Sequence, residues 1–301
     1  MNQTTKLYLL LAFTILIWGN SFVAVDVAIR DGASPVLIAM ARWTIASFIF
    51  GLYVMWKRPK SMQRSDYRGF VALAFIGVGV YYVFQYYGVK LAGPSVSSIL
   101  VTLLCPIVIF LISYTKFGER VSLLQKIGLA VSTAGAYLVI TNGTFSFISN
   151  RDELIGGVFG VVCAIFWALY TVGGKQILRR YDPVSSTAYI SFLGTVMLVP
   201  FAIADVEIVG NFSFPPSFWI AALYLGILCT VLGYVFWFRA LTGLSASATG
   251  VTLYFEPLVT VIFAWLILGQ TLGWIAGLGG ISVLAGVVLV SRGQHVGAGN
   301  R

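Results

Sequence analysis

Long apolar segments alternate with short polar connections along the whole chain. A membrane-spanning helix needs about 20 mostly apolar residues, and ten segments meet this length. They cover residues 6–26, 36–56, 68–90, 94–115, 124–141, 155–177, 184–203, 217–240, 245–267 and 272–291. The pattern predicts an all-α integral membrane protein with ten transmembrane helices.

Basic residues fall mainly in alternate connections. If the N-terminus is cytoplasmic, 15 of the 19 Lys and Arg residues lie on the inner side, and only Arg30, Lys90 and Arg151 lie outside. Arg42 remains inside the second apolar segment. Because inner loops of membrane proteins carry the excess of Lys and Arg, we expect a multi-pass protein of the cell (inner) membrane with both termini cytoplasmic.

The second half of the chain repeats features of the first at a nearly constant offset of about 150 residues. The matches join Trp18 to Trp167 at 149 residues, Tyr82 to Tyr234 at 152, and Pro106 to Pro257, Gly128 to Gly279 and Gly135 to Gly286 at 151. Each half carries five spans, and a repeat with an odd number of spans inserts with opposite orientation. The sequence therefore predicts two inverted five-helix repeats (5+5), residues 1–145 and 146–301.

Two matched prolines lie in the middle of predicted helices. Pro106 and Pro257 each remove a backbone N–H, which leaves the carbonyls of Thr102 and Leu253 without their helical partner. Opened backbone at matched depths in the membrane favours a cavity there. A kink that only aids helix packing is the alternative.

Composition excludes most other classes of protein. The chain is 59% hydrophobic and 10% charged, whereas soluble domains carry roughly 25% charged residues. The net charge of +9 is spread over connections between apolar segments, so no nucleic-acid partner is expected.

Residues for catalysis or metal binding are scarce. The single histidine, His295, lies in the polar tail, and Cys105, Cys163 and Cys229 lie inside apolar segments without the spacing of a metal site. We expect no catalytic residues, no metal, no cofactor and no enzymatic activity.

Several stretches resemble the EamA-type branch of the drug/metabolite transporter superfamily. They are Trp18-Gly19-Asn20-Ser21-Phe22, Ala41-Arg42-Trp43, Phe117-Gly118-Glu119-Arg120, Gly233-Tyr234-Val235-Phe236-Trp237 and Glu256-Pro257. The resemblance covers essentially the whole chain. It implies two EamA-like repeats around a cavity lined by the first, third, fourth, sixth, eighth and ninth helices, which moves small metabolites, often amino acids and frequently outward. Gln270 departs from the family, which commonly repeats there the acidic residue seen at Glu119.

Two ionisable residues lie deep in predicted helices, where charges are costly and are functional candidates by default. Arg42 has three candidate arrangements: a pair with Glu256, a pair with Asp26, or snorkelling to the outer surface. Glu256 lies near the midplane, so it is the candidate for coupling transport to protons. A structural role, hydrogen-bonded to the backbone opened by Pro257, is the alternative.

Aromatic residues with polar partners are dense where the repeat places the cavity. Rings with one polar group suit a pocket that stacks on flat or apolar solutes, although packing and interfacial belts also use them. The predicted substrate-binding residues are Trp18, Asn20, Tyr82, Gln85, Tyr86, Trp167, Tyr170, Trp237 and Tyr254.

These patterns together predict a secondary active transporter. We expect it to export small neutral or zwitterionic metabolites, amino acids foremost, by alternating access, with Glu256 and Arg42 as candidate coupling residues. Its partners are then the small-molecule substrate, the lipid bilayer and protons. A passive facilitator and a drug or nucleobase carrier of the same fold are the alternatives.

Overall fold

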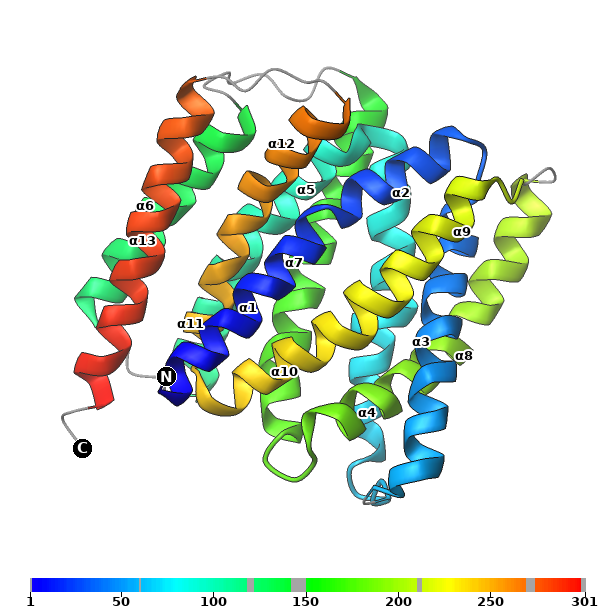
Figure 1. Ribbon diagram of the computed structural model, residues 1–301, viewed down its shortest axis with the longest axis horizontal. Coiled ribbons are helices and arrows are strands. Elements are labelled where there is room, and N and C mark those ends of the chain that lie inside the picture. The colour runs from blue at the N-terminus through cyan, green and yellow to red at the C-terminus, as the bar shows by residue number, and fades with distance from the viewer. Residues whose placement is uncertain are drawn as a thin grey trace.

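The computed structural model describes residues 2–59, 61–117, 122–141, 150–209, 213–268 and 274–298, and all regular structure in these ranges is helical (Figure 1). Within these described ranges, six helical stretches are long and apolar enough to cross a membrane, and two shorter apolar helices accompany them. The six are Gln3–Arg30, Pro35–Lys57, Tyr67–Gly93, Arg151–Ile177, Pro183–Asp205 and Pro216–Gly243, and the shorter two are Val101–Thr115 and Gly277–Val290. The chain is therefore a multi-pass helical membrane protein.

The helices follow the predicted spans, with several divided into shorter pieces. The first half contains α1 (Gln3–Gly19), α2 (Ser21–Arg30), α3 (Pro35–Lys57), α4 (Tyr67–Ala74), the π-helix η1 (Phe75–Gly79), α5 (Tyr81–Phe117) and α6 (Leu123–Thr141). The second half contains α7 (Arg151–Ile177), α8 (Pro183–Val209), α9 (Pro216–Leu223), the π-helix η2 (Tyr224–Leu232), α10 (Gly233–Gly243), α11 (Ala246–Gly250), the 3-10 helix η3 (Val251–Tyr254), α12 (Phe255–Leu268) and α13 (Trp274–Ala298). The first predicted span is thus α1 and α2 together.

Local chemistry explains several of these boundaries. Ser34 caps α3 by accepting a hydrogen bond from the Leu37 amide at 3.2 Å, with Pro35 at the first helical position. Gly93, with φ of 74°, separates the third and fourth predicted spans inside α5. Glycine adopts this left-handed conformation without the steric cost that a Cβ would bring.

The two prolines have different surroundings. Pro257 lies in the first turn of α12, where the preceding η3 interrupts the α-helix and a missing N–H costs little. Pro106 lies inside α5, which continues through it. The two π-helical segments are related by the repeat instead, because a shift of 152 residues carries η1 into η2. Such segments are frequent at functional sites.

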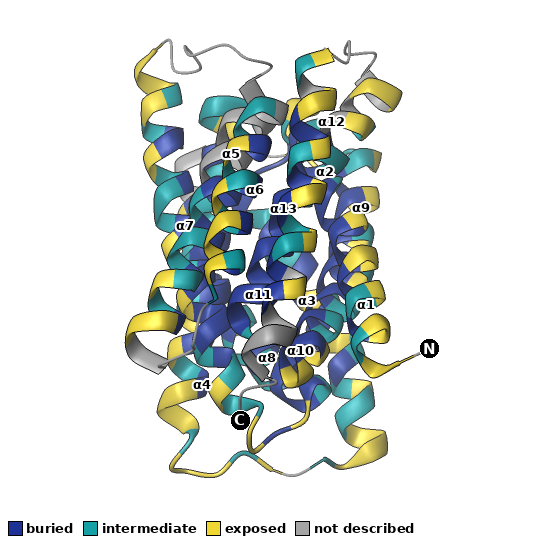
Figure 2. Ribbon diagram, turned by 90° about the vertical axis from the view of Figure 1, so that its left-hand side faces the viewer, coloured by how far each residue is buried: buried dark blue, intermediate teal, exposed yellow. Residues whose placement is uncertain are grey.

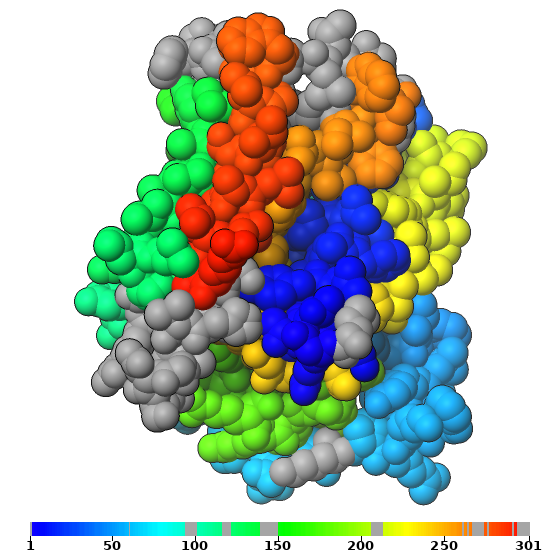
Figure 3. All heavy atoms as spheres, turned by 60° about the vertical axis from the view of Figure 1, so that its left-hand side comes forward, coloured from blue at the N-terminus to red at the C-terminus, as the bar shows by residue number. Residues whose placement is uncertain are grey.

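Helices α6 and α13 form an antiparallel pair at one flank of the bundle (Figures 1 and 3). A Cβ placed on Gly128 would lie 2.6 Å from the Gly286 carbonyl oxygen, and one on Gly135 would lie 2.7 Å from the Gly279 carbonyl oxygen. Glycines therefore allow the two backbones to touch. These are the four glycines that the 151-residue shift matches.

Buried residues occupy the middle of the bundle and exposed ones its outer faces (Figure 2). Many of the exposed side chains are large and apolar, as with Phe48 (68% exposed) and Ile220 (69%). On a soluble protein, exposed apolar surface on this scale would mark a site of contact with a membrane or with another protein. In a membrane protein, lipid covers this surface. Helix α1 begins, and α13 ends, at the end of the bundle where α3 leads into α4 (Figure 1); this is called the terminus end below.

Candidate functional site

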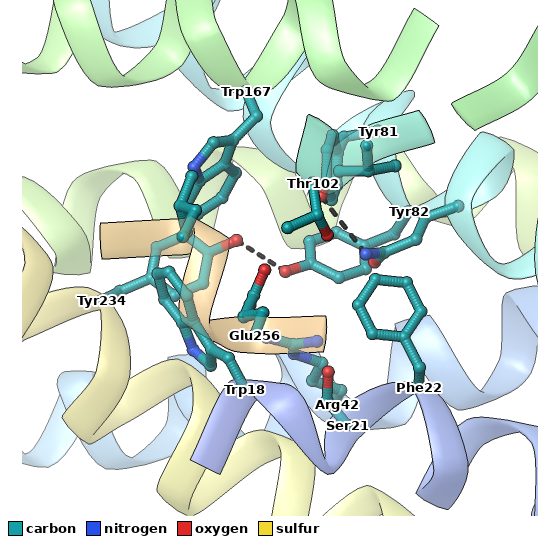
Figure 4. Close-up of a pocket in the computed structure, with 13 residues that line it drawn as sticks. Trp18, Ser21, Phe22, Arg42, Tyr81, Tyr82, Thr102, Trp167, Tyr234 and Glu256 are labelled. Atoms are coloured by element: carbon teal, nitrogen blue, oxygen red, sulfur yellow. Dashed lines mark hydrogen bonds between the residues drawn. The ribbon is translucent and has the colours of Figure 1, made fainter. Parts of the chain in front are cut away.

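A cavity lies at the centre of the bundle, walled by residues from both halves of the chain (Figure 4). Its lining comprises Trp18, Ser21, Phe22, Arg42, Tyr81, Tyr82, Gln85, Val101, Thr102, Trp167, Tyr234, Leu253 and Glu256. These come from α1, α2, α3, α5, α7, α10, η3 and α12. Arg42 adds the second predicted span to the set of helices that the family resemblance implies.

The cavity is small. Its volume is about 40 Å³, whereas a water molecule needs about 10–15 Å³ measured this way and ligand pockets run to about 300–1,000 Å³. The space holds a few waters. A metabolite requires the surrounding helices to move apart.

Two aromatic pairs meet at the centre of the cavity wall. The Tyr82 and Tyr234 hydroxyls are hydrogen-bonded at 2.5 Å. The Trp18 and Trp167 rings pack edge to face, with centroids 5.2 Å apart and planes at 84°, a favourable arrangement for aromatic quadrupoles. Each pair joins residues that the repeat matches.

The π-helix η2 positions Trp18. The indole Nε1 of Trp18 donates a hydrogen bond of 2.8 Å to the Cys229 carbonyl. Gly233 makes room for the ring, because a Cβ there would lie 2.5 Å from Nε1. Gly233, the first residue of the Gly233-Tyr234-Val235-Phe236-Trp237 motif, therefore allows the Trp18 ring to lie in this position.

Arg42 is buried in the cavity wall and held by neutral groups. Its Nε donates to Thr230 Oγ1 at 2.7 Å, and one terminal nitrogen donates to the Tyr86 hydroxyl at 3.0 Å. The guanidinium carbon lies 4.5 Å from the centre of the Tyr82 ring, a cation–π contact. The Thr230 hydroxyl gives its own proton to the Leu225 carbonyl, so its lone pairs face Arg42.

The structure decides among the three arrangements considered for Arg42. Asp26 pairs with Arg30 instead, at 2.8 Å, and the Arg42 side chain is too deeply buried to snorkel. Within the described ranges, Glu256 makes no ion pair with Arg42, although both line the same cavity. Neutral partners thus replace the predicted charged ones.

Glu256 reaches the cavity from the first turn of α12. A Cβ on Gly19 would lie 2.6 Å from the Val259 side chain, so glycine at that position lets α12 approach α1 closely. Thr260 Oγ1 donates to the Gly19 carbonyl at 2.6 Å and fixes the same approach. The Glu256 backbone carbonyl accepts a hydrogen bond from Thr260 Oγ1 at 2.9 Å. Its carboxylate makes no hydrogen bond to another described residue and is directed into the cavity (Figure 4).

The other predicted site residues fall into three groups. Trp18, Tyr82, Gln85 and Trp167 line the cavity. Tyr86, Tyr170 and Trp237 lie behind it, with Tyr170 stacked on Trp167 at 5.3 Å between ring centres and Trp237 packed 5.4 Å from Trp18. Asn20 and Tyr254 lie outside the lining residues.

Tyr254 contacts a different part of the bundle. Its hydroxyl is hydrogen-bonded to Thr133 Oγ1 on α6 at 2.6 Å and to the Leu103 carbonyl at 3.3 Å. Asn20 lies at the junction of α1 and α2, and its Oδ1 is buried without a partner among the described residues. The structure therefore places Tyr254 away from the cavity. Asn20 directly precedes Ser21, which lines the cavity.

Some lining residues are absent from the predicted set. Tyr234 carries a signal that could have found it, because it is the repeat partner of Tyr82. Thr102 and Leu253, which precede Pro106 and Pro257 by four residues, also line the cavity. Glu119 and Gln270, the pair on which the chain departs from the family pattern, lie outside the described residues.

Spanning helices that enclose a polar and aromatic cavity are typical of helical membrane transport proteins. The model of the EamA-like transporter family matches residues 5–141 and again residues 154–292. The chain therefore belongs to the EamA-like transporter family.

Relatives and a solved structure are consistent with this class. The chain is 34% identical over 294 residues to an "Uncharacterized transporter" of Archaeoglobus fulgidus, covering 97% of this chain and 100% of the relative. It is 26% identical to a "Probable terminal-alkyne amino-acid exporter" of Streptantibioticus cattleyicolor, covering 94% and 92%. One crystal structure matches with a TM-score of 0.77 at 20% identity over 97% of this chain and 98% of its own, which shows the fold alone. The family and the names of the relatives indicate a transporter rather than an enzyme.

Proposed function

We propose that this chain is a secondary active transporter that exports small neutral or zwitterionic metabolites, amino acids foremost, by alternating access. The observation that carries the proposal is the central cavity, where repeat-matched residues meet each other. Trp18 contacts Trp167, and Tyr82 contacts Tyr234. A site on the axis that relates two halves stays central when the halves exchange conformations, as alternating access requires.

The proposed architecture is two inverted EamA-like repeats of five helices, residues 1–145 and 146–301. Exchange of the halves would carry the contact of Gly128 with Gly286 into a contact of Gly279 with Gly135, and both contacts occur. The matched helices α6 and α13 run antiparallel in this pair. Equivalent helices that run in opposite directions support inversion rather than parallel repeats.

The small cavity supports a carrier rather than an open pore. A space of about 40 Å³ excludes a metabolite, so passage needs at least one further conformation in which the site opens to a surface. The family resemblance and the name of the Streptantibioticus cattleyicolor relative support outward transport and amino acids as substrates.

A counterflow measurement tests the proposal. Purified protein is reconstituted into proteoliposomes loaded with an unlabelled compound, and uptake of the labelled compound is followed across amino acids, nucleobases and cationic drugs. We expect a saturable, transient accumulation for at least one amino acid. Uptake that rises linearly with concentration and never exceeds equilibrium would instead establish a passive facilitator. Counterflow confined to drugs or nucleobases would establish the corresponding alternative.

We propose that the terminus end of the bundle faces the cytoplasm. The three native cysteines are buried, so introduced cysteines report orientation with little background. In intact cells, a membrane-impermeant maleimide should label Asp31→Cys, at the end of the bundle opposite the termini. The Ser65→Cys variant, near the terminus end, should react only after permeabilisation. The reverse pattern would contradict the positive-inside assignment and place both termini outside.

A further inference from the structure

The two charges in the cavity wall do not follow the repeat, although the aromatic residues do. The shift of 151 residues matches Glu256 with Cys105, and the shift of 148 residues that joins Pro35 to Pro183 matches Arg42 with Ile190. Among the lining residues, the first half therefore supplies the cation and the second half supplies the carboxylate. The cavity has a nearly symmetrical aromatic wall with two oppositely charged poles.

The cationic pole is fixed in place and has donors to spare. Thr230, Tyr86 and the Tyr82 ring hold the guanidinium from three directions. Two of its nitrogens are hydrogen-bonded in the described structure, and a guanidinium offers five N–H donors in a planar fork. Such a fork matches a carboxylate, which it binds through two parallel hydrogen bonds.

The anionic pole is a carboxylate without a hydrogen-bonded partner among the described side chains. Glu256 and Arg42 are not within ion-pair distance, so each of these ionisable groups is buried without an oppositely charged partner among the described residues. An unmatched buried charge is costly. A ligand that carries both opposite charges removes this cost at both poles together.

We infer that Arg42 and Glu256 form a recognition site for the two charged groups of a zwitterionic amino acid, with the α-carboxylate on Arg42 and the α-ammonium on Glu256. The inference rests on the proposed function and narrows its substrate class. The rest of the substrate lies against the rings of Trp18, Phe22 and Trp167, which line the same cavity.

Other substrate classes fit the two poles less well. A cationic drug meets the Arg42 guanidinium, and an anionic metabolite meets the Glu256 carboxylate. A neutral nucleobase leaves both charges unmatched. Specificity then comes from repulsion of these compounds as much as from attraction of the zwitterion.

The test uses three matched series of ligands. Leucine, phenylalanine and threonine are each compared with the amine that lacks the carboxylate and with the acid that lacks the ammonium. Equilibrium binding to the purified full-length protein in lipid nanodiscs is measured for all nine compounds. In at least one series we expect the amino acid to bind about tenfold or more tightly than either analogue, the size expected for a hydrogen bond to a charged group.

Substitution at the two poles should give crossed effects. The Arg42→Gln variant should lose about tenfold or more in affinity for the amino acid and bind the amine at least as tightly as wild type, because the repulsion from the guanidinium is removed. The Glu256→Gln variant should lose the preference for the amino acid over the acid and bind the acid at least as tightly as wild type, because the repulsion from the carboxylate is removed. Arg42→Lys retains the charge and should restore part of the discrimination. The control is Asp26→Asn, because that carboxylate pairs with Arg30 outside the cavity and should leave all ratios unchanged.

The outcomes separate this inference from the proposed function. Equal binding of amino acid and amine by the wild type, or parallel loss of all ligands in both variants, would overturn the two-pole site. A variant that retains one analogue at wild-type affinity is folded, so the crossed pattern carries its own control. If amino-acid counterflow occurs without the crossed pattern, the two-pole recognition site is refuted and the transporter proposal stands. If no compound of the panel gives counterflow, the transporter proposal is refuted.

Discussion

Replacing Gly286 with valine is expected to destabilise the protein strongly, while the same replacement at Gly277 of the same helix is expected to be tolerated. A Cβ on Gly286 would lie 2.2 Å from Ser132 Oγ, 2.6 Å from the Gly128 carbonyl oxygen and 2.6 Å from the Ser132 amide nitrogen. Two of these atoms are backbone, which can yield only if α6 and α13 separate. Overpacking of a close contact costs about 1–3 kcal/mol, and the loss of the dispersion contacts that hold membrane helices together adds to it.

The measurement is the thermal unfolding midpoint of the purified protein, followed by the fraction that remains monodisperse after heating. Gly277 is the matched control because, among the described residues outside its own turn of helix, no atom lies within 4 Å of a Cβ built there. We expect a lower midpoint for Gly286→Val and a midpoint near wild type for Gly277→Val. Equal midpoints would show that the α6–α13 contact does not stabilise the fold.

The repeat pattern located the centre of the site better than any single motif. Trp18 and Trp167, and Tyr82 and Tyr234, were matched by offset alone, and each pair is in contact. The proposed two-fold relation between the halves accounts for these contacts, because residues near such an axis meet their own equivalents. Periodicity along one helix carries no such information.

Rotation of a helix about its axis explains the position of Tyr254. It precedes Glu256 by two residues, which in a helix of about 3.6 residues per turn directs the two side chains to nearly opposite faces. Glu256 lines the cavity, whereas Tyr254 contacts Thr133 on α6. Its ring and hydroxyl placed Tyr254 in the predicted binding set, and helical geometry directs it away from the cavity that Glu256 lines.

The partners of Arg42 could not be read from charge. Depth in the membrane limited the candidates to Glu256, Asp26 and the outer surface, but Thr230 and Tyr86 hold the side chain. Thr230 lies in a π-helical segment, where the register differs from that of an α-helix. An apolar pattern does not reveal such a segment, so this contact could not be predicted from the sequence.

Glutamine at position 256 is expected to abolish accumulation of substrate driven by a pH gradient while leaving counterflow intact at saturating substrate. Coupling requires that protonation change the relative stability of the inward-open and outward-open states. Glu256 is buried on the cavity wall, and if it binds either a proton or the substrate ammonium, the two exchange across the membrane. Glutamine keeps the shape of the side chain but exchanges no proton.

The experiment compares wild type, Glu256→Gln and the control Asp26→Asn in proteoliposomes with an imposed pH gradient and a clamped membrane potential. A gradient of about one pH unit is worth about 1.4 kcal/mol and supports at most about tenfold accumulation in one-to-one exchange. We expect this accumulation in wild type and Asp26→Asn, and none in Glu256→Gln. Counterflow by Glu256→Gln should persist but require more substrate, because the ammonium has lost its charged partner. Glu256 is the only carboxylate among the described residues that line the cavity. If Glu256→Gln still concentrates substrate as wild type does, Glu256 does not couple transport to protons, and no described carboxylate of the cavity does.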